Sequence, residues 1–325
     1  MMSRKKILLI LTGGTISMDT ERNLSSDILH LQKERLQLLE NKMLDDIEFD
    51  TFVFAMKPSP HITPDDMLTL AEFIDDQVMK DIYQGFVITH GTDTLEETAF
   101  FIDLYFSEYP LRFPIVFTGS MRNYSDIAYD GLNNIVSALL VASHVEAKKH
   151  GVLVVLNDII NTASEVTKSH TVSLDTFKSL NFGPIGIIDD YQILFYRQIS
   201  PAFNFSKIKR IDKKVYIYKT FSGDDGSLLL ALKDYDAVIL EGFGRGNVPP
   251  LIVPVIQKLI ENNVIVVIST RVPAGRVFGT YPYNGGGGQL VKIGCFLTPD
   301  LNSQKARILL LYALSAGMDI KTLLT

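Results

Sequence analysis

Short apolar runs recur along the first half of the chain, each bounded by glycine or polar residues. Because the runs lack the alternation of half-exposed strands, they predict strands buried on both faces, as in a parallel sheet. Segments with helical periodicity separate the runs, so the pattern predicts a sheet covered by helices on both faces. The predicted strands are 6–12, 85–89, 115–118 and 152–156, and the predicted helices are 63–83, 94–106 and 126–147.

The pattern changes between residues 195 and 213, where Pro201 and scattered charge replace the periodicity. Strand and helix signals then resume, and Gly285–Gly288 reads as a loop. We therefore predict an α/β fold of two α/β domains: a larger N-terminal domain with a mainly parallel sheet flanked by helices (1–194), a linker (195–213) and a smaller C-terminal α/β domain (214–325). In this second part the predicted strands are 214–218, 237–240 and 264–269, and the predicted helices are 227–233, 249–262 and 303–315.

Composition narrows the class of protein. The chain has 325 residues, of which 46% are hydrophobic and 21% charged, as in a globular protein. The formal net charge of −6 argues against nucleic acid as a partner. No apolar run is long enough to span a bilayer, and the N-terminal run is too short for a signal peptide. The single cysteine, Cys295, excludes an internal disulfide, so we expect a cytoplasmic protein. Its small apolar setting predicts a buried thiol rather than a nucleophile.

Polar residues follow the predicted strands, where ligands bind in open parallel sheets. Thr12-Gly13-Gly14-Thr15 follows the first strand, and His90-Gly91-Thr92-Asp93 follows the second. The fourth strand leads on to Lys168. A threonine hydroxyl needs a partner to become a nucleophile, and glycine N–H groups can stabilise an oxyanion. Thr92 and Asp93 begin a helix, which favours an anionic ligand group, whereas Asp93 favours an ammonium, so this corner suits the α end of an amino acid.

Each of these residues also has a structural interpretation. A glycine pair after a first strand also serves phosphate loops, but the Rossmann and P-loop spacings are absent. His90 is a general base or, at least as well, a histidine that holds the turn. Lys168 alone is typical of a solvated surface charge. Neither the histidines nor the cysteine has metal-ligand spacing, so we expect no metal and no organic cofactor. The combination on one edge of the sheet favours an enzyme.

At these residues the chain resembles the bacterial-type L-asparaginase family, which includes the glutaminase-asparaginases. Two signature segments are present at residues 11–17 (LTGGTIS) and 88–95 (ITHGTDTL). Further matches occur at 166–168, 244–247, 269–273 and 304–307, so the resemblance covers nearly the whole chain.

The resemblance implies that Thr15 attacks the side-chain amide carbon, releases ammonia and forms an acyl-enzyme. It implies Thr92 as a second essential threonine, linked to Asp93 and Lys168. It also implies that Ser59, Asp93, Thr92 and Gly14 bind the substrate. The expected assembly is a homodimer or homotetramer in which Asn247 reaches a neighbouring subunit's site. The implied substrate is L-asparagine, with L-glutamine as the alternative.

Three departures from the family pattern bear on the substrate. The family's mobile-loop tyrosine is missing, because no tyrosine precedes Tyr83. Pro60 follows Ser59 where glutamine is common in the secreted type. Residues 279–284 hold no acid, whereas many members lend a glutamate to the partner's site there. Tyr281 or Tyr283 is a candidate for either gap.

The sequence therefore predicts an L-asparaginase, with a glutaminase-asparaginase, an amidase for a related amino-acid amide and a non-catalytic asparagine or aspartate sensor as alternatives. An ammonia-supplying amidotransferase subunit is disfavoured, because the first motif at Leu11 leaves no room for the extra N-terminal domain of that branch.

Overall fold

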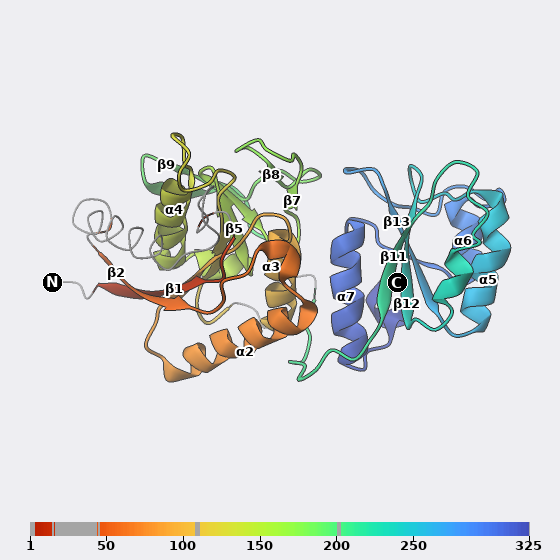
Figure 1. Ribbon diagram of the computed structural model, residues 1–325, viewed down its shortest axis with the longest axis horizontal. Coiled ribbons are helices and arrows are strands. Elements are labelled where there is room, and N and C mark those ends of the chain that lie inside the picture. The colour runs from red at the N-terminus through yellow and green to blue at the C-terminus, as the bar shows by residue number, and fades with distance from the viewer. Residues whose placement is uncertain are drawn as a thin grey trace. The chain divides into compact units, whose positions relative to one another are not determined.

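The computed structural model describes residues 4–14, 16, 44, 46–107, 111–199 and 203–324 (Figure 1). The chain divides into two compact units, Met1–Phe205 and Ser206–Thr325. Each unit has its own main sheet with helices packed against it, and the sheet of the first unit is the larger. The predicted fold class is confirmed.

The first unit is built on an eight-stranded sheet in the order β10-β9-β6-β5-β4-β3-β1-β2. Strands β1 to β5 are parallel to one another, and β6, β9 and β10 complete the sheet in antiparallel pairings. The strands of this sheet are β1 (Lys5–Leu11), β2 (Ile47–Val53), β3 (Gly85–Thr89), β4 (Ile115–Thr118), β5 (Leu153–Leu156), β6 (Ile159–Thr162), β9 (Gly186–Asp189) and β10 (Gln192–Phe195). A separate antiparallel pair joins β7 (Thr167–Lys168) to β8 (Phe177–Lys178).

Helices cover both faces of this sheet, with α4 (Gly131–Ser143) on one side and α2 (Pro64–Lys80) and α3 (Leu95–Tyr105) on the other (Figure 1). The start of α2 follows the sequence signal. Thr63 accepts the Asp66 N–H, and the Asp66 carboxylate accepts the Thr63 N–H, which forms a reciprocal cap. The unit also contains the short 3₁₀ helices η2 (Ser59–His61) and η3 (Ala147–His150).

The second unit has a four-stranded parallel sheet in the order β11-β12-β13-β14. Its strands are β11 (Val215–Lys219), β12 (Ala237–Gly242), β13 (Ile265–Thr270) and β14 (Phe296–Leu297). Its helices are η4 (Leu229–Leu232), η5 (Pro250–Ile252), α5 (Val253–Glu261), α6 (Gly287–Lys292), α7 (Ser303–Ser315) and α8 (Ile320–Leu324). Cys295 is buried in this unit, and burial raises the pKa of its thiol to about 12, as expected for a structural cysteine.

Some predicted elements were wrong in detail. The helix predicted from Asp126 begins at Gly131, because Asp126 and Asp130 instead accept N–H groups of the preceding loop. The helix predicted at 227–233 is only the 3₁₀ turn η4. The glycine loop predicted at Gly285–Gly288 is shorter than expected, because α6 begins at Gly287.

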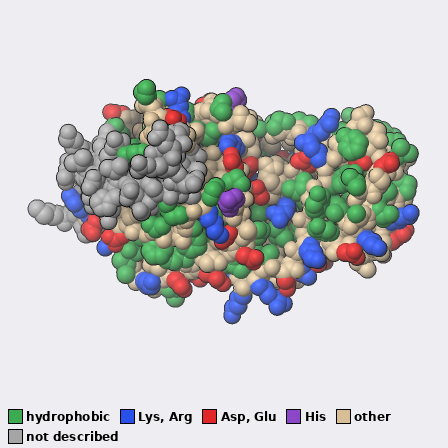
Figure 2. Space-filling model, in the orientation of Figure 1, with side chains coloured by type: hydrophobic (Ala, Val, Ile, Leu, Met, Phe, Trp, Pro, Cys, Tyr) green, Lys and Arg blue, Asp and Glu red, His purple; other side chains and the backbone are tan. Residues whose placement is uncertain are grey.

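Charged side chains of both signs are interspersed over the face drawn in Figure 2. Among the described residues, no helix combines the length and the apolar character that a membrane span requires.

Candidate functional site

Three neighbouring parallel strands end at the same level of the first sheet. Leu11 of β1 pairs with Thr89 of β3, and Thr89 pairs with Thr118 of β4. Thr12 extends the link between the first two strands, because its Oγ1 donates to the Thr89 carbonyl oxygen at 2.9 Å. The segments that follow these strands therefore meet at one edge, as the sequence predicts.

Glycines let the two loops at this edge touch through their backbones. A Cβ atom on Gly14 would lie 2.3 Å from the Gly91 Cα atom, and a Cβ on Gly91 would lie 2.8 Å from the Ser59 Oγ. Gly14 also has φ +82°, a conformation that other residues rarely adopt. The close approach explains why the sequence has glycine at both positions.

Ser59 fixes the start of α3 from outside the helix. The Ser59 Oγ accepts the Asp93 N–H at 3.2 Å, and Thr94 Oγ1 donates to the Ser59 carbonyl oxygen at 2.8 Å. Ser59 is almost fully buried. Thr94 occupies the N-cap position of α3 but makes no side-chain cap bond, so its hydroxyl serves this tertiary contact instead.

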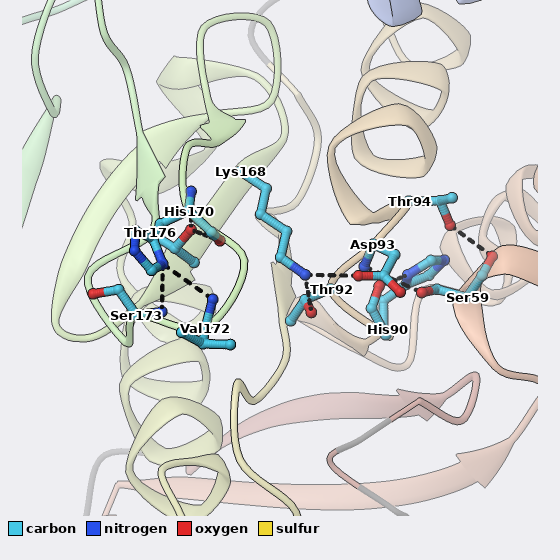
Figure 3. A network of polar contacts seen from close by, with 11 residues as sticks. Ser59, His90, Thr92, Asp93, Thr94, Lys168, His170, Val172, Ser173 and Thr176 are labelled. Atoms are coloured by element: carbon cyan, nitrogen blue, oxygen red, sulfur yellow. Dashed lines mark hydrogen bonds and ion pairs between the residues drawn. The ribbon is translucent and has the colours of Figure 1, made fainter.

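Lys168 reaches this edge from the β7–β8 pair (Figure 3). Its Nζ donates to Thr92 Oγ1 at 3.0 Å and to Asp93 Oδ1 at 2.7 Å. The structure thus brings the Lys168 amine to the adjacent hydroxyl and carboxylate of Thr92 and Asp93, which precede it by 76 and 75 residues along the chain. A cation beside Oγ1 stabilises negative charge that develops on that oxygen, which is what a threonine hydroxyl needs to take part in acyl transfer.

The three side chains differ in their contact with solvent. Thr92 is buried, and the Lys168 side chain is 16% exposed, whereas the Asp93 side chain is 61% exposed. In this ion pair Lys168 is therefore largely enclosed by the protein, whereas Asp93 is accessible to a ligand. This asymmetry suits a site in which Asp93 meets a substrate group while Lys168 acts on Thr92.

His90 lies beneath this edge, fully buried. Its Nδ1 is 2.8 Å from the Gly91 carbonyl oxygen, and its Nε2 is 3.0 Å from Thr98 Oγ1. Because a carbonyl oxygen only accepts, we place the ring proton on Nδ1, and Nε2 then accepts from the Thr98 hydroxyl. Burial lowers the pKa of His90 to about 4, against the effect of the Gly91 hydrogen bond. These contacts support a histidine that holds the turn over a general base.

We expect His90 to make the protein less stable in acid. The unfolded state binds a proton near the ordinary histidine pKa and the folded state only near 4, so the free energy of unfolding falls as the pH drops through this window. The loss attributable to His90 between pH 7 and pH 4 is roughly 3 kcal/mol. Urea unfolding across this range measures it in the parent and in His90→Asn, whose Nδ2 keeps a donor near the Gly91 carbonyl oxygen.

The variant is expected to lose less stability than the parent over the same interval, whatever its stability at pH 7. Parallel curves for the two proteins would contradict a buried neutral imidazole at this position.

The remaining predicted residues are placed as follows. Thr15 lies outside the described residues. Asn247 lies in the second unit, after β12, where its Oδ1 accepts the Gly287 N–H at 3.2 Å. Tyr281 and Tyr283 of the same unit are both exposed, with ring centroids 5.4 Å apart. The described residues contain no cluster of three or more His, Cys, Asp or Glu side chains arranged to hold a metal ion.

Two residues near Lys168 were not identified as candidates from the sequence. His170 and Thr176 organise the turn between β7 and β8, close to Lys168 (Figure 3). The available signal was a histidine two positions after the lysine, at the head of a polar turn.

Two family models match the chain, "Asparaginase, N-terminal" over residues 6–201 and "Glutaminase/Asparaginase C-terminal domain" over residues 214–324. An L-asparaginase of Bacillus licheniformis is 34% identical over 315 residues, covering 96% of each chain. A probable L-asparaginase of Deinococcus radiodurans is 37% identical, covering 82% of this chain and 83% of its own. A glutaminase-asparaginase of Acinetobacter glutaminasificans is 32% identical, covering 98% of this chain and 97% of its own.

Proposed function

The chain belongs to the asparaginase family, and from this premise we propose that it hydrolyses L-asparagine to L-aspartate and ammonia. The observation that carries the proposal is the contact of Lys168 Nζ with both Thr92 Oγ1 and Asp93 Oδ1. It gives the edge of the sheet a hydroxyl next to a cation and an exposed carboxylate, which is chemistry suited to an amino-acid amide.

In the proposed reaction Thr15 is the nucleophile. Its hydroxyl oxygen forms a bond to the side-chain amide carbon, ammonia leaves with the hydroxyl proton, and water then releases aspartate from the acyl-enzyme. This role rests on the family motif around Thr15. Thr92 acts as the second threonine, whose oxygen is held and polarised by Lys168.

The substrate's α end is proposed to bind at the start of α3. The Asp93 carboxylate suits the α-ammonium, and Ser59 and the N–H groups near Gly14 suit the α-carboxylate. Support comes from the exposure of Asp93 and from the hydrogen bond that ties its backbone to Ser59. Tyr281 or Tyr283, which are both exposed, is proposed to fill either the gap left by the family's loop tyrosine or the gap left by the glutamate that a partner subunit lends.

Ammonia release from purified protein tests the function. We expect turnover of L-asparagine by the parent and none by Thr15→Ala. Absence of turnover by the parent, together with tight aspartate binding in calorimetry, would favour a sensor over an enzyme. Turnover that survives Thr15→Ala would remove Thr15 from the proposed role.

A glutaminase-asparaginase is the second candidate, because a relative of that name covers nearly the whole chain. The side chain of L-glutamine is one methylene longer, so the amide carbon must reach Thr15 from the same α-end contacts. The assay with L-glutamine and D-asparagine beside L-asparagine separates the candidates by their kcat/KM values.

We further propose a cytoplasmic homodimer or homotetramer in which Asn247 reaches a neighbouring subunit's site. The single buried cysteine is compatible with a reducing compartment. Light scattering tests the assembly, and mixing Thr15→Ala with Asn247→Ala subunits tests the shared site, because only hybrid assemblies would contain an intact one.

A further inference from the structure

Lys168 is carried by a very small element. Strands β7 and β8 contain two residues each, and Lys168 pairs with Phe177 across them. A hairpin this short has few backbone hydrogen bonds and little stability of its own. The position of the Lys168 side chain therefore depends on whatever closes the turn between the two strands.

The turn is closed by one imidazole ring. His170 Nδ1 accepts the N–H groups of Val172 and Ser173, each at 3.1 Å (Figure 3). An acceptor at this position of a side chain bends the backbone of the next three residues into a tight turn. The ring thus supplies two hydrogen bonds to the backbone of the turn beyond the short ladder.

Thr176 connects this turn to the strand that bears Lys168. Its Oγ1 accepts the His170 N–H at 2.8 Å and donates to the His170 carbonyl oxygen at 2.5 Å. The Ser169 N–H and Oγ both donate to the Thr176 carbonyl oxygen, at 2.8 and 2.7 Å. Thr176 is fully buried. Through its hydrogen bonds to Ser169, a change in the turn is transmitted to this neighbour of Lys168.

The ring performs this role only while Nδ1 is unprotonated, because a protonated nitrogen donates and cannot accept. His170 is exposed, so protons from solvent reach it. Charged residues of the same hairpin have partners of their own: Asp175 pairs with Lys178 at 2.7 Å, and Lys168 pairs with Asp93 at the start of α3, also at 2.7 Å.

We propose that His170 is a positioning residue for the hydrolysis of the amide, acting through the turn to hold Lys168 Nζ against Thr92 Oγ1. The inference rests on the proposed function and deepens it. Loss of the Nδ1 acceptor releases the turn, so part of the catalytic rate depends on a residue that touches neither substrate nor nucleophile.

Two substitutions test the acceptor. His170→Ala removes it, and we expect kcat to fall roughly tenfold with KM within about threefold, because two hydrogen bonds that set the position of a catalytic group are lost. His170→Asn places Oδ1 where Nδ1 stood and keeps the acceptor. We expect it to restore kcat to within about threefold of the parent.

Val172→Ala is the matched control, because it trims a side chain that is 72% exposed and keeps the N–H that His170 accepts. It is expected to leave kcat and KM unchanged. Equal kcat values for His170→Ala and the parent, or a kcat for His170→Asn as low as that of His170→Ala, would overturn the inference.

Hydrogen exchange at the Val172 and Ser173 amides gives a readout that does not need turnover. We expect slow exchange in the parent and in His170→Asn and fast exchange in His170→Ala; equal rates in all three would contradict the turn's dependence on the ring. A parent with protected amides but no turnover would overturn the proposed function and leave the hairpin as described. An active parent unaffected by His170→Ala would overturn only the positioning role.

Discussion

Replacement of Lys168 by methionine is expected to lower kcat for L-asparagine about 1,000-fold. Methionine has a similar length and suits a side chain that is 16% exposed, so the fold is retained while the cation is removed. Thr92 Oγ1 then loses the donor at 3.0 Å, and Asp93 Oδ1 loses its counter-charge at 2.7 Å. Steady-state ammonia release measures the effect.

Lys168→Arg separates charge from geometry. It keeps the positive charge, but the planar guanidinium cannot occupy the position of a compact ammonium between two oxygens. We expect a loss of at least about tenfold in kcat, smaller than that of methionine. An arginine variant as active as the parent would indicate that only the charge matters.

Lys178→Met is the control for this series. Lys178 lies on β8 of the same hairpin, its side chain is 44% exposed, and it pairs with Asp175 at the surface. Loss of an exposed pair of this kind costs little, so kcat is expected to stay within about twofold. A comparable loss of activity in Lys168→Met and Lys178→Met would assign the effect to the hairpin's charge and remove Lys168 from the proposed mechanism.

The sequence predicts the central strands well because their signal is local. Strands β3 and β4 are continuous apolar runs that lie buried on both faces, and the structure places them at the predicted residues. The hairpin of β9 and β10 gave no such signal. Its two-residue turn, Asp190-Tyr191, has φ +46° and +63° without the glycine that usually marks such turns.

The candidate site likewise has a part that the sequence predicts and a part that it does not. The ends of β1 and β3 meet because parallel strands of one sheet share an edge, and this is deducible from the pattern. The contact of Lys168 with Thr92 is not, because it depends on how the β7–β8 hairpin returns to the sheet. The role of His170 emerges only from the geometry of the turn, since a lone exposed histidine has no distinctive sequence pattern.

Gly14→Ala is expected to destabilise the first unit by about 4 kcal/mol and to abolish measurable turnover. The new Cβ would lie 2.3 Å from the Gly91 Cα atom and 2.4 Å from its nitrogen, so one of two backbones must move. A residue with φ +82° adds a further cost of about 1 kcal/mol. Urea unfolding followed by circular dichroism measures the change in stability.

Gly183→Ala isolates the conformational part of this cost. Gly183 lies in the same unit with φ +73°, but none of the residues that the structure describes comes within 4 Å of a Cβ built there. We therefore expect a loss of only about 1 kcal/mol and normal turnover. If the two variants are equally stable, the close approach of the loops after β1 and β3 is wrong, and with it the juxtaposition on which Thr15 and Thr92 would act together. A large difference in stability, with turnover lost only in Gly14→Ala, would instead tie the chemistry to the contact between these two glycine loops.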